Sequence, residues 1–169
     1  ALAERLGFIY EDLKIKFIDD YIRTAKQLNS VFKKYDLNII VSCVDNNSTR
    51  KLLNDYFNMT VNWGEKLIYI DSGNGDKDRV GQVITGYTEG KNVLSKPAAA
   101  YFPEIMDDDE DLSKMQSCTR VSSEHPQNIA TNVMAASIVF SVLTNILMYR
   151  KVEKGIIYFD VDKHFMVSR

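Results

Sequence analysis

An aspartate and an arginine follow an apolar run of strand length near residue 45. Residues 37–44 are almost continuously apolar and end at Asp45, and Arg50 follows about one helical turn later. In an open α/β sheet, ligands bind where the carboxyl end of a parallel strand leads into the next helix. A carboxylate there can hold a metal ion, and a guanidinium beside a helix amino terminus can neutralise phosphate. The spacing therefore predicts a site for a phosphate and its metal ion.

The same residues have structural alternatives that the sequence leaves open. Asp45 is either a site residue or the cap of the helix predicted over 47–58. Asn46 either contacts the ligand or, more simply, caps that helix. Arg50 either binds phosphate, orients Asp45 through a bidentate pair, or forms an ion pair that fixes the helix to a loop.

The two cysteines differ in their expected surroundings. Cys118 lies among polar residues, and Arg120 and His125 nearby would lower its pKa, so it is a candidate nucleophile. The alternative is an ordinary loop thiol. Cys43 lies within the apolar run and is expected to be a small core residue. Because the sequence has no C-x-x-C pair and no Cys/His cluster, we predict no structural zinc.

The elements that must position these residues alternate along the first half of the chain. Apolar periodicity predicts helices over 24–35 and 47–58, and strands over 14–22, 37–44 and 67–71. The later elements are a strand over 81–87, a long helix over 128–149 and a hairpin over 155–161 and 164–168. This order predicts an α/β, Rossmann-like three-layer domain whose mixed sheet ends in antiparallel strands.

One uncharged segment imitates a membrane span. No charged residue occurs between Pro126 and Tyr149, which is about the length that a bilayer requires. Polar residues interrupt it at helical spacing, namely Ser137, Ser141, Thr144 and Asn145. We therefore interpret the segment as a helix packed on the sheet, and we predict no membrane association.

A long segment between the strands and the last helix has no clear period. Residues 88–127 are expected to form an irregular crossover loop. The acidic run 107–111 within it is either a solvated loop or a docking patch for a basic partner. Before this segment, Gly73, Gly75 and Gly81 are interpreted as residues that permit the positive φ of tight turns.

Composition limits the class of protein. The 169 residues are 45% apolar and 26% charged, which fits a single domain over 1–169. The net charge of −2 argues against a general nucleic-acid surface. Two unpaired cysteines and the lack of a signal peptide favour a reducing, cytoplasmic location.

Four segments, in order along the chain, resemble the ThiF/MoeB/HesA group of the ubiquitin-activating-enzyme superfamily. The segment VSCVDNNSTRKLLNDYF resembles the D-N-x-x-T-R-x-x-x-N element of that group. The others are ALAERLG, YIDSGNGDKDRVGQVITG and YFPEIMDDDEDLSKMQSCTRVSSEHPQNIATNVMAAS. The last is similar to the crossover segment and final helix of ThiF-like proteins from bacterial plasmid-borne gene systems. Together the segments span essentially the whole chain.

The resemblance implies an ATP-dependent adenylyltransferase. A carboxylate, often the Gly-Gly terminus of a ubiquitin-like or sulfur-carrier protein, would attack the α-phosphate of ATP and release pyrophosphate. Asp45 matches the family's aspartate that helps to place Mg²⁺ beside ATP, with Asn46 and Arg50 as further nucleotide-binding candidates. Some members form a thioester at a loop cysteine, and Cys118 is the candidate here. Relatives commonly form homodimers.

The chain also departs from the family pattern. The family's G-x-G-x-x-G loop does not occur in the sequence. The chain thus resembles the carboxyl-terminal half to two-thirds of such a protein, without its first βαβ half, and we expect this portion alone to be inactive. Two other functions stay open: a Rossmann-like binding or assembly module without catalysis and, with less support, a nicotinamide-dependent oxidoreductase.

Overall fold

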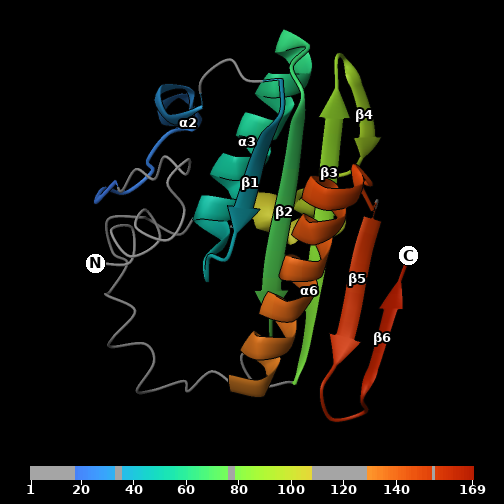
Figure 1. The fold of residues 1–169 in the computed structure, drawn as a ribbon. Coiled ribbons are helices and arrows are strands. Elements are labelled where there is room, and N and C mark those ends of the chain that lie inside the picture. The colour runs from blue at the N-terminus through green and yellow to red at the C-terminus, as the bar shows by residue number, and fades with distance from the viewer. Residues whose placement is uncertain (1–17, 33–35, 76–78, 108–128, 154) are drawn as a thin grey trace, which may run out of the picture.

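The structure, a computed structural model, describes residues 18–32, 36–75, 79–107, 129–153 and 155–169 (Figure 1). The strands are β1 (Asn38–Ser42), β2 (Leu67–Asn74), β3 (Val80–Glu89), β4 (Asn92–Ser95), β5 (Gly155–Asp160) and β6 (Phe165–Ser168). The helices are α2 (Ala25–Val31), α3 (Asn47–Trp63), the 3-10 helix η1 (Ala98–Ala100), α4 (Glu104–Asp107) and α6 (Ile129–Tyr149).

All six strands belong to one mixed sheet. Its order is β1-β2-β3-β5-β6, and β4 pairs with β3 beside this path. β1 and β2 are parallel, and α3 is the crossover between them. The other pairs are antiparallel, which confirms the predicted α/β domain with a mixed sheet that ends in antiparallel strands.

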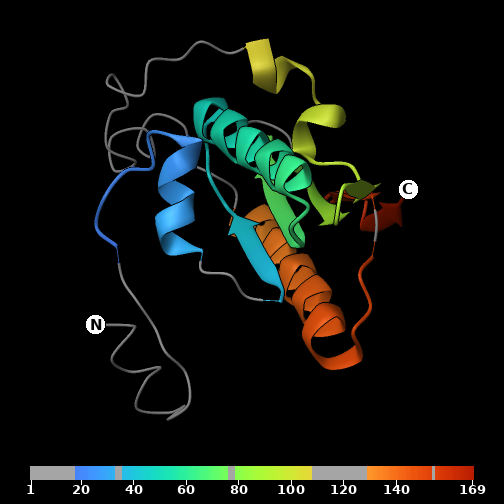
Figure 2. The same ribbon diagram turned by 90° about the horizontal axis from the view of Figure 1, so that it is seen from above.

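Helices cover both faces of the sheet. Figure 2 shows α2 and α3 on one side and α6 on the other. Successive side chains of a strand point to opposite faces, so Tyr69 and Ile70 of β2 enter different cores. Tyr69 packs with Phe57 of α3, whereas Ile70 packs with Val142 of α6. The domain therefore has three layers.

Helix α3 begins where the sequence predicts and ends later. Asn46 is its N-cap, and Gly64, with φ of 72°, is its left-handed C-cap. The helix runs to Trp63 instead of Asn58 because no helix-breaking residue occurs before Gly64. Leu53, Tyr56 and Phe57 of its predicted apolar side are buried.

Strand β1 is covered less completely than its composition suggests. Ile40 and Ser42 are buried, but the side chain of Val41 is 41% exposed. The reason is position, because β1 lies at an edge of the sheet formed by the described residues. An apolar run does not by itself guarantee that both faces of a strand are covered.

Two predicted elements need correction. Residues 18–22 form no strand, and Ile18 and Tyr21 are exposed, so no core holds them extended (the rest of the predicted 14–22 strand lies outside the described residues). Part of the predicted irregular loop over 88–127 is regular. β3 continues to Glu89 and turns into β4, and η1 and α4 follow, while residues 108–127 lie outside the described chain. The turn at Gly90 and Lys91 interrupts the apolar pattern, so periodicity alone does not reveal the short strand β4.

Helix α6 agrees with the helix predicted over 128–149. Its inner face packs on the sheet through Thr131, Ala135, Ile138, Val139, Val142 and Ile146. By length and composition, α6 is also the one helix among the described residues that could cross a membrane. Its packing on the sheet agrees with the interpretation as a core helix.

Candidate functional site

A cavity of about 460 Å³ lies at the carboxyl ends of β1 and β2. One wall comes from the segment between β1 and α3, with Cys43, Val44 and Asp45, and from Arg50 of α3. The opposite wall is α6, and the end of β2 contributes Ser72 and Asn74. Its volume falls within the range of small-molecule sites. The predicted location of the site is thus a real cavity with one polar and one apolar wall.

The amino terminus of α3 is capped by Asn46. The Asn46 side chain accepts a hydrogen bond from the backbone N–H of Thr49 at 2.7 Å. Asn46 is thus the N-cap of α3, as the structural alternative for this residue predicts. Asp45 lies two positions before the first residue of α3, is exposed, and accepts a hydrogen bond from the Asn46 amide at 3.4 Å.

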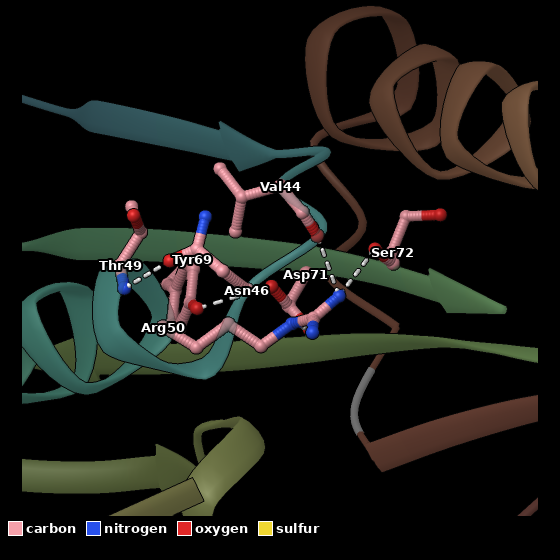
Figure 3. A network of polar contacts seen from close by, with 7 residues as sticks. All are labelled: Val44, Asn46, Thr49, Arg50, Tyr69, Asp71 and Ser72. Atoms are coloured by element: carbon pink, nitrogen blue, oxygen red, sulfur yellow. Dashed lines mark hydrogen bonds and ion pairs between the residues drawn. The ribbon is translucent and has the colours of Figure 1, made fainter. Parts of the chain in front are cut away.

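Arg50 is held inside the site by protein groups. Its Nε lies 3.3 Å from Oδ2 of Asp71, and one terminal nitrogen donates to the carbonyl oxygens of Val44 at 2.7 Å and Ser72 at 3.4 Å. Figure 3 shows the guanidinium between β2 and the segment after β1. The ion-pair alternative is therefore the observed one, and Arg50 fixes the segment that carries Asp45.

Asp71 is the partner that sequence reasoning missed. Its side chain is 2% exposed and also accepts a hydrogen bond from the Tyr69 hydroxyl at 3.2 Å. Burial, followed by the charge of Asp71, raises the pKa of Tyr69 above its ordinary value, so this phenol stays protonated. The available signal was an acidic residue at the end of a buried strand, since a buried carboxylate requires a partner.

Two glycines of the β2–β3 ladder, Gly73 and Gly81, have no room for a side chain. A Cβ at Gly73 would lie 2.8 Å from Nε2 of Gln82 and 3.2 Å from a guanidinium nitrogen of Arg50. A Cβ at Gly81 would overlap the ring of Phe159. Neither glycine has positive φ. The predicted reason, a tight turn, is therefore wrong for Gly73 and Gly81, because close packing within a longer β2–β3 ladder excludes a side chain there.

Cys43 does not have the position that its apolar neighbours suggest. The residue is exposed and lines the cavity, because β1 ends at Ser42 and the chain turns away from the core. The prediction of a small core residue is wrong. Desolvation and then the nearby carboxylate of Asp71 raise the pKa of the Cys43 thiol, so it is a poor nucleophile at neutral pH.

Most of the other predicted site residues lie outside the described part of the chain. Cys118, Arg120 and His125 lie outside the described residues, as do 108–111 of the acidic run. Asp107 at the start of that run is exposed on α4. The cavity brings together Asp45 and Arg50 of the predicted set, with Asn46 beside them at the start of α3.

A hydrogen bond links the end of β2 to α6. The side-chain amide of Asn74 donates to the side-chain oxygen of Asn132 at 2.5 Å. Both asparagines line the cavity, and neither was among the predicted site residues. Asparagine at the end of a strand is so common that its sequence position gives no specific signal.

The donor set fits one kind of metal ion better than others. Among the described residues, no three His, Cys, Asp or Glu side chains come close enough to hold a metal by themselves. Asp45 supplies one hard oxygen ligand beside the cavity. Mg²⁺ commonly takes one or two carboxylates and completes its shell with water and substrate phosphates. The arrangement can therefore serve an ion that arrives with a phosphate ligand.

Comparison with known proteins gives no family match. No protein-family model and no curated protein matches this chain.

Proposed function

We propose that this chain belongs to an ATP-dependent enzyme that adenylates a carboxylate, and that it supplies part of the nucleotide site. The observation that supports it best is the place of Asp45, which lines a cavity at the carboxyl ends of two parallel strands. The amino end of α3, a helix of 17 residues, begins two positions later. Open α/β sheets bind phosphorylated ligands at this position. The segment resemblance to ThiF/MoeB/HesA proteins supplies the reaction.

The chain's own residues have distinct parts in this proposal. Asp45 would hold Mg²⁺ through a carboxylate oxygen, and the bound ion would supply charge neutralisation for the phosphates. Asn46 keeps the first turn of α3 in place through its cap. Arg50 acts as a positioning residue, because its guanidinium is committed to Asp71 and to two carbonyl oxygens. The earlier expectation that Arg50 binds phosphate is thus not part of the proposal.

The proposed reaction balances without an external oxidant or reductant. A carboxylate oxygen of the substrate forms a bond to the α-phosphorus of ATP, and the bond from that phosphorus to the bridging oxygen breaks. Pyrophosphate leaves with the electron pair, and the product is an acyl-adenylate. The substrate class is the carboxyl terminus of a ubiquitin-like or sulfur-carrier protein, a separate molecule. Transfer to Cys118 as a thioester stays a further prediction.

One observation favours the alternative, a binding module without catalysis. Arg50 is the one cationic side chain among the described residues that line the cavity, and Asp71 pairs with it. Transition states of phosphoryl transfer carry charge that enzymes stabilise with cationic groups or metal ions. A module that binds a nucleotide and does not react would not require another cation.

Exchange of labelled pyrophosphate into ATP distinguishes the two functions. The assay uses the intact natural protein with Mg²⁺ and a carrier protein that ends in Gly-Gly. We expect exchange in the parent and its loss in Asp45→Asn, which keeps the side-chain shape and removes the charge. Asp55→Asn, at an exposed position of α3 remote from the cavity lining, is the matched control and should exchange at the parent rate.

Calorimetry with ATP and Mg²⁺ completes the test. ATP binding without exchange in the parent supports the binding module. Exchange at the parent rate in Asp45→Asn shows that Asp45 has no part in placing Mg²⁺ and overturns the proposed site.

A further inference from the structure

Both neighbours of Asp45 are fixed by hydrogen bonds, although Asp45 itself is exposed. On its carboxyl side, Asn46 accepts a hydrogen bond from the backbone N–H of Thr49 at 2.7 Å. On its amino side, the carbonyl oxygen of Val44 accepts one from a terminal nitrogen of Arg50, also at 2.7 Å. A short segment that is held at both ends has few backbone conformations left. The position of Asp45 therefore depends on how firmly Arg50 is itself held.

Arg50 takes its orientation from a carboxylate behind the cavity wall. Its Nε lies 3.3 Å from Oδ2 of Asp71, and a different nitrogen of the same guanidinium donates to Val44. A guanidinium is planar and rigid, so a rotation at one nitrogen also moves the others. The Arg50 side chain is 15% exposed, which leaves water little access to replace these partners. A movement of Asp71 therefore reaches the carbonyl group of Val44.

The Tyr69 hydroxyl holds the other oxygen of this carboxylate. It donates to Oδ1 of Asp71 at 3.2 Å, whereas Oδ2 takes part in the ion pair with Arg50. Contacts on both oxygens fix the plane of a carboxylate, and a contact on one oxygen does not. The Tyr69 ring is buried, and its centroid lies 6.5 Å from that of Phe57, so the hydroxyl is anchored in the core. Figure 3 shows Tyr69 and Asp71 on β2, with Arg50 between them and Val44.

The guanidinium also lies close to the backbone of β2. The nitrogen that donates to Val44 lies 3.4 Å from the carbonyl oxygen of Ser72 as well. A Cβ at Gly73 would lie only 3.2 Å from this nitrogen. A group enclosed in this way cannot turn without losing one of its contacts. We call the connected contacts of Tyr69, Asp71, Arg50 and Val44 the Tyr69 network.

We propose that Tyr69 is a positioning residue for Asp45. It acts through Asp71 and Arg50, and it lies outside the described lining of the cavity. The inference rests on the proposed function, in which Asp45 would hold Mg²⁺, and it adds a residue from the core between β2 and α3. Burial and then the charge of Asp71 raise the pKa of Tyr69, so its hydroxyl keeps the proton that it donates.

Backbone NMR relaxation tests the Tyr69 network without ATP. In the intact natural protein, Tyr69→Phe keeps the ring and removes the hydroxyl. The amide order parameters of residues 44–46 should then fall from about 0.85 towards about 0.6. Tyr87→Phe is the matched control, because the Tyr87 hydroxyl also donates to a carboxylate, that of Glu89 at 3.0 Å, and is remote from the cavity lining. It should leave these order parameters unchanged.

A double-mutant cycle tests whether Tyr69 acts through Arg50. Arg50→Lys keeps the charge but loses the planar group that reaches both Asp71 and Val44, so it should release residues 44–46 by itself. Tyr69→Phe should therefore have no further effect when it is added to Arg50→Lys. An equal effect of Tyr69→Phe with and without Arg50→Lys would mean that Tyr69 acts by another path, and would overturn the proposal.

Pyrophosphate exchange connects the Tyr69 network to Mg²⁺. Tyr69→Phe should raise the apparent KM for Mg²⁺ about fivefold, the effect of roughly one hydrogen bond, and leave the KM for the carrier protein unchanged. Excess Mg²⁺ should restore the exchange rate, whereas a general loss of structure would not respond to Mg²⁺. A parent without exchange would contradict the proposed function, and the order parameters would still decide whether Tyr69 holds the segment.

Two further results would overturn the proposal. The first is a folded Tyr69→Phe variant in which residues 44–46 keep the order parameters of the parent. The second comes from Asp71→Asn, which keeps the side-chain shape and breaks the network one contact later. It must loosen the same residues, so parent values there would overturn the proposal even where Tyr69→Phe does not fold. Circular dichroism verifies the fold of each variant.

Discussion

The two long helices cover opposite faces of one sheet, yet their outward sides differ in chemistry. α3 turns polar side chains to solvent at Asp55, Asn58 and Asn62. α6 presents Val133 and Phe140 instead. In an amphipathic helix, the sheet buries the apolar face and the polar face lies in water. In a helix that is apolar on both sides, the sheet buries one apolar face and the other stays exposed. The solvent side of α3 is therefore polar, whereas that of α6 is largely apolar.

The same two helices divide the site between them. α3 brings hydrogen-bonding and charged groups to the cavity through its first turn, and these groups are fixed by Asp71 and by the backbone. α6 contributes an apolar wall and one amide, that of Asn132. The polar wall of the cavity thus comes from the start of α3, and most of its apolar wall comes from α6.

The largest expected effect is on the free energy of unfolding, and it differs between the buried side of α3 and the exposed side of α6. Phe57 is 0% exposed and Phe140 is 72% exposed. Phe57→Ala should lower the free energy of unfolding by about 3–5 kcal/mol through lost burial and a cavity. Phe140→Ala should change it by less than about 0.5 kcal/mol. Urea denaturation measures both, and equal losses would show that the outer face of α6 is part of the core.

The next effect concerns the ion pair at the start of α3. Arg50→Ala should cost about 3 kcal/mol or more, because it leaves the carboxylate of Asp71 buried without its cation. Arg79→Ala removes the exposed pair with Asp162 and should cost less than about 1 kcal/mol. Urea denaturation of the two variants gives the comparison. A small loss in Arg50→Ala would mean that water reaches Asp71.

A smaller effect is expected at the cap of α3. Asn46→Ala removes the acceptor for the Thr49 N–H and should lower stability by about 1 kcal/mol. Asn58→Ala, exposed in the middle of the same helix, should be neutral or slightly stabilising, since alanine favours the helix. Thermal unfolding followed by circular dichroism compares them. Equal midpoints for the two variants would contradict the assigned cap.

The smallest expected effect is a shift in the reactivity of Cys43. Desolvation and the charge of Asp71 stabilise the protonated thiol, so its pKa lies above the ordinary value. In a Cys118→Ser variant, iodoacetamide should react slowly at neutral pH, and the rate should rise with a midpoint above that of a peptide cysteine. A midpoint at or below the peptide value would show that the field of Asp71 does not reach the sulfur.

The sequence by itself determined the elements that local signals encode. Asn46 and the apolar spacing of Leu53, Tyr56 and Phe57 predict the start and the buried side of α3, and the structure has both. The long helix before residue 149 and the final hairpin follow from the same kind of signal. Caps and periodicity act over a few residues, so they can be recognised without knowledge of the fold.

Only the tertiary structure decided how these elements complete the site. The parallel register of β1 and β2 sets Ser42 beside Asp71 and brings Arg50 to a carboxylate 21 residues away. It also placed Cys43 on a cavity wall and left apolar side chains of α6 such as Phe140 exposed. Periodicity predicts which residues are buried. It does not predict which distant residues come into contact, because strand order and helix packing decide those contacts.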